Sequence, residues 1–250
     1  MSLKLRWLKM NQNEFTGYVV SRKNINDADK IISVITRDQG RQSFIAKGVR
    51  KPKAKLQSQL EPLVETKFRV IGKSKLPTLV GAKGLELNSF FNSSIEANFS
   101  ALLLTEVIDI FSADEMVSEL AYDAYSGAIK YLSDTPKTSL ALNYYLLHIL
   151  KAYGIEPHIE TGLNKYFLDF NDGTINSIGG NNSVAIDIET VKLWNACLKH
   201  NDRLLDKLNV NKRSLSDSLN LLISYIQHHS DRKIKSAKVL SESTNLLQAS

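Results

Sequence analysis

The sequence is short of cysteine and of long apolar runs, and each absence excludes a class of protein. A single cysteine, Cys197, excludes an internal disulfide bond and any metal site built from several thiolates. No run approaches the roughly 18 consecutive apolar residues of a membrane-spanning helix. The segment MSLKLRWLKMNQNEF at the start lacks the apolar centre of a signal peptide. We therefore expect a soluble cytoplasmic protein without a membrane partner.

Patterns that carry catalysis or nucleotide binding are also missing. Residues 72–74, GKS, resemble the end of a phosphate-binding loop, but Lys67 stands where that loop requires its first glycine. Cys197 has no His or Asp pattern nearby that would activate it. His228 and His229 are adjacent, so on a helix their side chains diverge. We expect no catalytic centre, no metal site and no cofactor.

Positive charge is concentrated in the first third of the chain. The 250 residues carry a formal net charge of +6. Residues 1–87 hold 18 Lys or Arg against 7 Asp or Glu, a net charge of +11, whereas residues 88–250 hold 14 against 19, a net charge of −5. This asymmetry favours a polyanionic partner for the first part and a different task for the second.

Short strands are predicted for the first third. Five segments are rich in β-forming residues or alternate between apolar and polar residues: 14–22, 29–36, 41–48, 62–71 and 75–83. Five short strands suit a small barrel, and the OB-fold, which binds nucleic acid strands, has this number. An SH3-like barrel has the same number. We assign residues 1–83 to this small basic barrel.

Helices are predicted for the remainder, so the expected fold class is α+β. Ser93 and Glu96 form a capping-box pattern before an apolar helix. Residues 155–186 lose the helical period and gain Gly and Asn, which predicts an irregular or small β insert. We assign residues 84–250 to a helical domain with this insert. Its further helices are predicted at 114–132, 137–153, 187–200, 214–229 and 232–247.

The order of features in residues 17–62 resembles the N-terminal region of the bacterial DNA repair protein family RecO. That region has a Gly-x-Val strand, an acidic turn before a Lys-Ile strand, Thr-Arg followed by Gly, and Ala-Lys-Gly ahead of a basic loop that ends near Leu-x-Pro. The matching residues here are 17–19, 27–31, 36–40, 46–48 and 50–62. Weaker matches at residues 154–157 and 232–240 extend the resemblance through the helical part.

This resemblance implies that residues 1–83 form an OB-fold that binds DNA, joined to an α-helical domain, in a non-enzymatic mediator of recombination. RecO proteins bind single- and double-stranded DNA and anneal complementary strands. They also bind the acidic C-terminal tail of single-stranded DNA-binding protein and, with RecR, help to load RecA. The resemblance therefore implies DNA, RecR and that tail as partners, RecA indirectly, and a cytoplasmic location at the nucleoid.

One departure from the family is the missing zinc module. Many members carry four cysteines just after the Gly-x-x-Pro landmark, whereas residues 162–180 contain none. A tetrahedral zinc ion needs four thiolate or imidazole ligands, which this region does not supply. We interpret residues 155–186 as a cysteine-free remnant of the module. The side chains expected to hold it by packing are Tyr166, Phe167, Phe170 and Ile178.

The segment AKGVRKPKAK, residues 46–55, is the main candidate for binding DNA. Phosphates repeat along a strand without sequence information, so a loop rich in Lys and Arg suits backbone contacts. An idle solvated loop is the alternative. Tyr18, Phe44 and Phe68 are near enough to stack on bases, although Phe44 and Phe68 fit the barrel core better. The expected DNA contacts are Lys47, Arg50, Lys51, Lys53 and Lys55, extended at strand ends by Arg22, Lys23, Arg37 and Arg41.

A second group of cations lies in the helical part. If the helices around residues 213–235 form a hairpin, the two halves of the group come together at one end. They could then extend the DNA path or receive an acidic peptide tail, and a solvated helix end is the alternative. The group consists of Lys212, Arg213, Arg232, Lys233, Lys235 and Lys238.

Two other functions fit some of these features. The chain could be a protein–protein adaptor whose DNA affinity is incidental, with recognition on helical surfaces. It could also be an RNA-binding OB-fold protein, which fits the charge but not the RecO-like landmarks. Charge reversal in residues 47–55 separates the mediator from the adaptor, because only the mediator then loses its activity.

Overall fold

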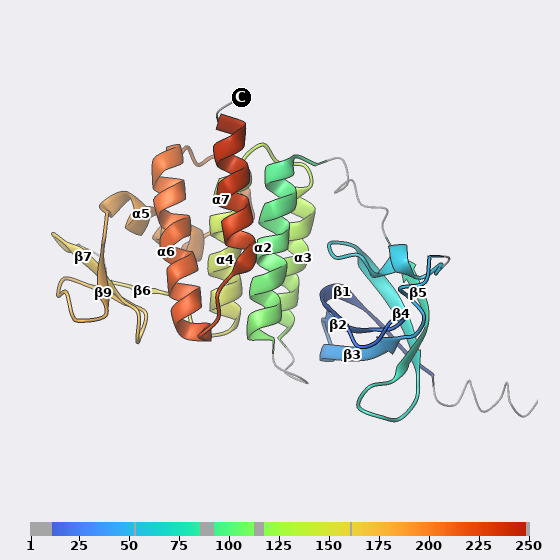
Figure 1. Ribbon diagram of the computed structural model, residues 1–250. Helices are drawn as coiled ribbons and strands as arrows, with labels where there is room; N and C mark the ends of the chain where they lie inside the picture. The colour runs from blue at the N-terminus through green and yellow to red at the C-terminus, as the bar shows by residue number, and fades with distance from the viewer. Residues whose placement is uncertain (1–11, 53, 86–92, 113–117, 161, 249–250) are drawn as a thin grey trace, which may run out of the picture. The chain divides into compact units, whose positions relative to one another are not determined.

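The structure, a computed structural model, describes residues 12–52, 54–85, 93–112, 118–160 and 162–248 (Figure 1). The chain divides into two compact units. Unit 1 comprises Met1–Phe91 and Ser112–Tyr122, and unit 2 comprises Asn92–Phe111 and Asp123–Ser250. Unit 1 thus takes in a short later segment that a division at residue 83 leaves out. Within the described residues, no helix has the length and apolar character needed to cross a membrane.

Five strands of unit 1 close into a barrel in the order β1-β2-β3-β5-β4. Neighbouring strands are antiparallel except β3 and β5, which pair in parallel at Ile45 and Thr78. This closed five-stranded barrel is OB-like, and it confirms the expected fold class. The strands are β1 (Gln12–Asn24), β2 (Lys30–Thr36), β3 (Gly40–Ala46), β4 (Glu65–Ile71) and β5 (Thr78–Gly84).

Aromatic side chains fill the barrel. Phe15, Phe44 and Phe68 meet in the core, with ring centroids 5.3 to 6.0 Å apart. Gly17 leaves room where β1 crosses β2, because a Cβ atom there would lie 2.2 Å from the carbonyl oxygen of Ile35. The segment after β3 closes the barrel, since Val49 and Leu60 belong to the same core (the short helix η1 is Gln57–Leu60).

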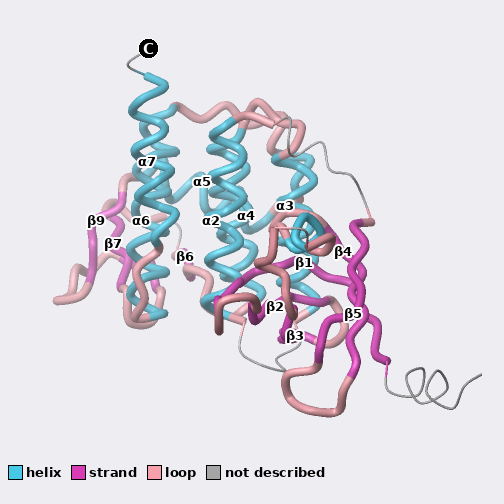
Figure 2. The backbone as a smooth tube through the Cα atoms, turned by 45° about the vertical axis from the view of Figure 1, so that its right-hand side comes forward, coloured by secondary structure: helices cyan, strands magenta, loops and turns pink. Residues whose placement is uncertain are grey.

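Helices of unit 2 lie side by side (Figures 1 and 2). The central helix is α4, which contacts α2, α5 and α6, while α7 packs along α2. Most of α4 is buried, from Thr138 to Leu150, because it has neighbours on several sides. The helices are α2 (Ile95–Phe111), α3 (Glu119–Leu132), α4 (Thr138–Ala152), α5 (Ile188–Lys199), α6 (Lys212–Ser230) and α7 (Lys235–Gln248), with a short helix η3 (Asp202–Leu204).

A buried chain of hydrogen bonds fixes α4, α5 and α6 against one another. Trp194 Nε1 on α5 donates to Ser218 Oγ on α6 at 2.6 Å, and Ser218 Oγ donates to Asn143 Oδ1 on α4 at 2.5 Å. Asn143 Nδ2 also donates to the carbonyl of Leu215 at 3.2 Å. Breaking one bond would leave a buried polar group unpaired, so the chain specifies how the three helices pack.

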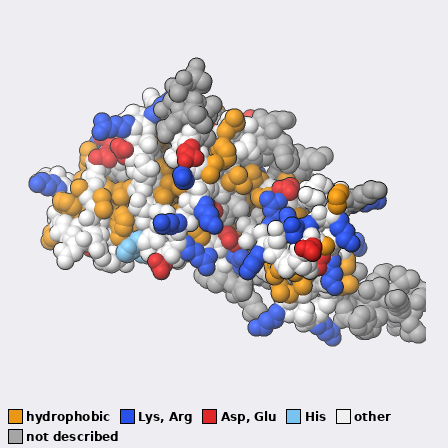
Figure 3. All heavy atoms as spheres, in the orientation of Figure 1, with side chains coloured by type: hydrophobic (Ala, Val, Ile, Leu, Met, Phe, Trp, Pro, Cys, Tyr) orange, Lys and Arg blue, Asp and Glu red, His pale blue; other side chains and the backbone are white. Residues whose placement is uncertain are grey.

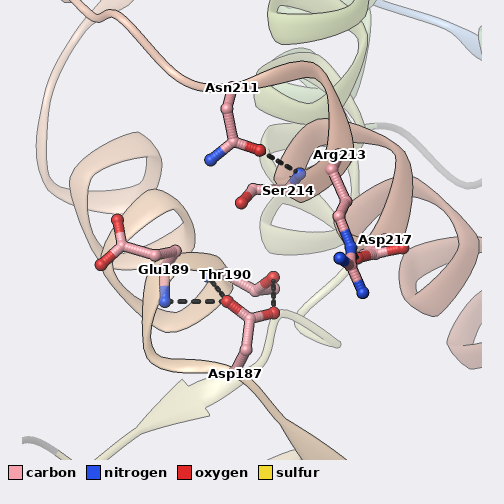
Figure 4. A network of polar contacts seen from close by, with 7 residues as sticks. All are labelled: Asp187, Glu189, Thr190, Asn211, Arg213, Ser214 and Asp217. Atoms are coloured by element: carbon pink, nitrogen blue, oxygen red, sulfur yellow. Dashed lines mark hydrogen bonds and ion pairs between the residues drawn. The ribbon is translucent and has the colours of Figure 1, made fainter.

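Polar residues cap α5 and α6 at their N-termini (Figure 4). Asp187 accepts hydrogen bonds from the backbone N–H groups of Glu189 and Thr190, both at 2.9 Å. Asn211 accepts from the backbone N–H of Ser214 at 2.8 Å. These bonds satisfy donors that have no partner inside the helix, and they set where each helix begins.

The capping box expected at Ser93 and Glu96 was wrong. The cap of α2 is Ser94, whose Oγ accepts from the backbone N–H of Ala97 at 3.1 Å. A capping hydroxyl reaches the N–H three residues ahead, so the helix starts one residue later than the pattern suggested. Glu96 accepts instead from Ser139 Oγ of α4 at 2.7 Å.

The insert is a four-stranded sheet in the order β6-β8-β7-β9. Leu168 and Ile175 pair across β7 and β8 and are fully buried. Phe170 contacts Tyr225 of α6 edge-on, with ring centroids 5.8 Å apart. The packing role expected of Ile178 was wrong: it lies beyond the end of β8 and is 77% exposed. The strands are β6 (His158–Ile159), β7 (Tyr166–Asp169), β8 (Thr174–Asn176) and β9 (Ser183–Ile186).

Candidate nucleic-acid interface

Strand pairing brings three loops to one end of the barrel, which we call the loop end. The first residue of β2 pairs with the last residue of β3. The first residue of β5 pairs with the last residue of β4 and with Ile45 near the end of β3. In OB-folds the loops between strands 1 and 2 and between strands 4 and 5 border the nucleic-acid binding face. The loops at this end comprise residues 25–29, residues 72–77 and the first part of the segment 47–64, which continues to the start of β4 at the other end of that strand.

The basic loop after β3 is fixed to the turn between β1 and β2. Asp29 Oδ1 accepts from the backbone N–H of Gly48 at 2.6 Å. Arg50 donates through its backbone N–H to the carbonyl of Ala28 at 3.0 Å and through its guanidinium to the carbonyl of Asn26 at 2.6 Å. Gly48 has a φ of 65°, a left-handed conformation that glycine adopts without penalty. The two loops therefore form one surface.

Asp29 is held ionised beneath the cations of this loop. The hydrogen bond from the Gly48 N–H lowers the pKa of Asp29 most, and the bond from the Asn26 side chain lowers it further. Desolvation opposes these effects, and the positive charges of Lys47 and Lys51 add to the lowering. The carboxylate thus anchors the loop at neutral pH.

Five exposed lysines stand at the loop end. Lys47, Lys51 and Lys55 lie on the basic loop, and their side chains are exposed. Lys73 and Lys75 are exposed on the loop between β4 and β5. In the part of the chain that the structure describes, none of the five forms an ion pair. Figure 3 shows Lys and Arg side chains at many points on the visible face of the barrel.

Lys73 and Lys75 were missed by reasoning from sequence. Residues 72–74 were considered only as a failed phosphate-binding loop. The usable signal is the strand order of an OB barrel, which places the loop between strands 4 and 5 beside the end of strand 3. Among the predicted contacts, Lys53 lies outside the described residues, and the guanidinium of Arg50 is engaged by Asn26.

The strand-end cations divide between the two ends of the barrel. Lys23 is exposed near the loop end, whereas Arg22 beside it forms an ion pair with Glu61 at 2.6 Å. Arg37 and Arg41 flank the hairpin between β2 and β3, at the opposite end of strands that span about 20 Å. The structure therefore does not bring Arg37 and Arg41 to the basic loop.

Both distant arginines have partners within unit 1. Arg37 lies 3.2 Å from a carboxylate oxygen of Glu119. Arg41 donates to the carbonyl and the hydroxyl of Ser112 at 3.3 and 3.2 Å. These contacts join the β2–β3 hairpin to the second segment of unit 1.

On the described strands of the barrel, no aromatic ring is exposed enough to stack on a base. Phe44 and Phe68 are fully buried, as the sequence favoured, and Phe15 is 7% exposed. Tyr18 is 2% exposed and contacts the ring of Tyr122 at 5.8 Å, so stacking of Tyr18 on a base was a wrong expectation. Any contact with bases must use other side chains.

The second basic group does not converge. Lys212 and Arg213 begin α6, and the other four members follow its C-terminus. A helix of 19 residues is about 28 Å long, so the two halves lie at opposite ends. Arg213 lies 3.7 Å from Asp217 one turn along (Figure 4). Convergence at one end was therefore wrong, because α7 starts where α6 stops.

The cysteine and the two adjacent histidines of unit 2 are packed against other side chains. Cys197 is 1% exposed, and burial raises its pKa to about 12, so its thiol does not ionise at neutral pH. The rings of His228 and His229 contact Phe170 and Tyr225 respectively. Among the described residues, no group of three or more His, Cys, Asp or Glu could hold a metal ion.

Comparisons with known proteins cover both units. Residues 10–88 match the family model "Recombination protein O N terminal", and residues 92–238 match "Recombination protein O C terminal". The chain is 24% identical over 212 residues to the DNA repair protein RecO of Dehalococcoides mccartyi, covering 80% of this chain and 83% of the relative. It is 20% identical over 239 residues to the DNA repair protein RecO of Moorella thermoacetica, covering 90% and 89%.

Proposed function

The chain belongs to the RecO family of DNA repair proteins, and from this premise we propose that its loop end binds the phosphate backbone of DNA. The observation that carries the proposal is the cluster of exposed lysines from two separate loops of an OB-like barrel. Each lysine that neutralises a phosphate releases condensed counterions, which favours binding to any sequence. Phosphate contacts of this kind position a strand without reading its bases.

We further propose that the protein is a non-enzymatic mediator that anneals complementary strands. Two strands repel each other through their phosphates, and a shared cationic surface reduces that repulsion. Base pairing then lowers the free energy without further input, so annealing needs neither ATP nor a catalytic group. Family membership supports RecR and the C-terminal tail of single-stranded DNA-binding protein as partners, with RecA loading as the outcome at the nucleoid.

The cations at the junction of α6 and α7 are the candidate receiver for the acidic tail. Arg232, Lys233, Lys235 and Lys238 lie within seven consecutive residues there. A carboxylate-rich peptide gains charge-assisted hydrogen bonds from such a group. Lys212 and Arg213 at the other end of α6 are excluded from this site by distance.

Binding of a fluorescent single-stranded oligonucleotide across a salt series tests the DNA proposal. Contact between five lysines and five phosphates predicts a log–log slope of about −3.5 for the wild type. The variant Lys47→Glu/Lys51→Glu/Lys55→Glu should bind far more weakly and lose about 2 from that slope. Arg50 stays unchanged because it holds the loop in place.

The matched control is Lys207→Glu/Lys212→Glu/Arg213→Glu, which reverses three exposed charges on unit 2. It should bind DNA nearly as the wild type does, because those residues lie outside the loop end. If the triple variant keeps the affinity and slope of the wild type, the lysines of the basic loop are solvated surface and the adaptor function gains support.

A further inference from the structure

On the outer face of β1, β2 and β3, paired residues of neighbouring strands form rows that run across the sheet. Tyr18 pairs with Ile35, and Ile35 pairs with Arg41. The second segment of unit 1 covers this row, since Tyr122 contacts Tyr18 and Ser112 accepts from Arg41. Tyr18 and Ile35 are accordingly only 2% and 3% exposed.

The row nearest the loop end is aliphatic on β2 and β3. Ile31 pairs with Ile45, and both are half-buried. Their neighbours Ile32 and Phe44 lie in the core, so Ile31 and Ile45 point outward by the alternation of a strand. Between this row and the covered one, Ser33 and Ser43 face each other with their hydroxyl oxygens 2.9 Å apart.

Three more exposed aliphatic side chains belong to neighbouring segments. Leu76 and Val80 flank the residues that pair with Ile45, since the Ile45 N–H donates to the carbonyl of Pro77 and Ile45 pairs with Thr78. Ile25 in the first loop is 42% exposed, Leu76 in the loop before β5 is 38% exposed, and Val80 at a bulge of β5 is 40% exposed. We call the five residues the aliphatic strip: Ile25, Ile31, Ile45, Leu76 and Val80. Exposed lysines adjoin its members, with Lys23 paired to Ile31 and Lys75 next to Leu76.

We propose that the aliphatic strip receives the bases of single-stranded DNA while the phosphates follow the lysines. This inference rests on the proposed function and names the preferred form of its ligand. Unpaired bases expose apolar faces, whereas a duplex hides those faces in its stack. An apolar row bordered by cations therefore complements a single strand better than a duplex.

The chemistry of the strip also sets its selectivity. Aliphatic side chains offer no donor or acceptor to the edges of bases, so the strip does not read sequence. Burial of apolar surface is insensitive to salt, whereas phosphate contacts follow counterion release. Changes in the strip should therefore alter affinity without altering the salt slope.

The first test is the variant Ile45→Thr/Val80→Thr, which keeps the β-branched shape and the charge of each position. Its affinity for a single-stranded oligonucleotide should fall about fivefold, as the loss of apolar contact predicts. Its duplex affinity and salt slope should match the wild type. The control is Val184→Thr on β9, which is 44% exposed and lies in unit 2.

The second test adds an aromatic ring at the exposed bulge position with Val80→Trp. The emission that this ring adds to that of Trp7 and Trp194, obtained by subtracting the wild-type signal, should be quenched by a single-stranded oligonucleotide and not by a duplex, because only unpaired bases can stack on the ring. Single-strand affinity should rise. An unquenched tryptophan together with wild-type binding by the threonine variant overturns the inference.

The outcomes separate this inference from the proposed function. A wild type that binds no DNA refutes the proposed function. A wild type with the expected salt slope, beside strip variants that behave alike on both DNA forms, leaves the proposed function standing and refutes the strip. If the threonine variant has a lower melting temperature than the wild type, the quenching experiment alone tests whether the strip binds bases.

Discussion

Asp29 is the residue on which the position of the basic loop depends. Its carboxylate accepts from Gly48 at 2.6 Å and from the Asn26 side chain at 3.1 Å. We expect Asp29→Ala to release the loop, so that the Gly48 amide exchanges with solvent at least about tenfold faster. Hydrogen exchange followed by NMR measures this rate. DNA binding should weaken, because the lysines would have to be ordered on binding.

The pH dependence of this anchor follows from the direction of the pKa shift. The folded pKa of Asp29 is lower than its ordinary value of 3.8, so the anchor contributes stability above that value. The contribution is lost as the pH falls through the folded pKa. Asp38→Ala, in the exposed turn at the opposite end of the barrel, is the control, and its Gly48 amide should exchange at the same rate as that of the wild type at each pH. Equal exchange in both variants would contradict the anchoring role.

At the scale of elements, the strands and helices could be predicted because their signals are local. Alternation marked β4, where Thr66, Phe68 and Val70 are buried and Lys67 and Arg69 are exposed. Apolar residues at helical spacing likewise marked α6. Buried side chains recur every second residue along a strand and about every 3.6 residues along a helix. The spacing of apolar residues in the sequence therefore indicates which type of element a segment forms.

The meeting of distant loops could not be predicted in the same way. Lys73 and Lys75 join Lys47 only because β5 lies between β3 and β4 in the closed barrel. Lys212 and Lys233 separate because a single helix spans the residues between them. Both results depend on contacts remote in sequence, for which a local pattern carries no signal.

The start of α7 depends on a side chain from another helix. Glu106 of α2 accepts from the backbone N–H groups of Lys235 and Ser236 at 2.9 and 2.8 Å, and from Ser236 Oγ at 2.6 Å. A carboxylate at this place satisfies unpaired donors and complements the helix dipole. We expect Glu106→Ala to lower the free energy of unfolding by about 1–2 kcal/mol. Urea denaturation gives this value.

Glu242→Ala is the matched control on α7. Glu242 is exposed and lies 3.7 Å from Lys238, so its loss should cost less than about 0.5 kcal/mol. Hydrogen exchange adds a spatial test, since Glu106→Ala should raise exchange most in the first turn of α7. A uniform change over the whole of unit 2 would argue against a capping role.

At the scale of the whole molecule, the position of charge should matter more than its amount. Changing Lys47, Lys51, Lys55, Lys73 and Lys75 to Gln reduces the formal net charge from +6 to +1, since five positive charges are removed. A second variant reaches the same net charge by changing five exposed lysines of unit 2. These are Lys192, Lys199, Lys207, Lys212 and Lys233.

Annealing of complementary oligonucleotides, measured without ATP or divalent metal, compares the two variants. The loop-end variant should lose most of its annealing rate, because strands no longer share a cationic surface. The unit 2 variant should retain most of it, although both proteins have the same net charge and the same nonspecific attraction to DNA at long range. Equal losses would mean that total charge, rather than the loop end of the barrel, brings the strands together.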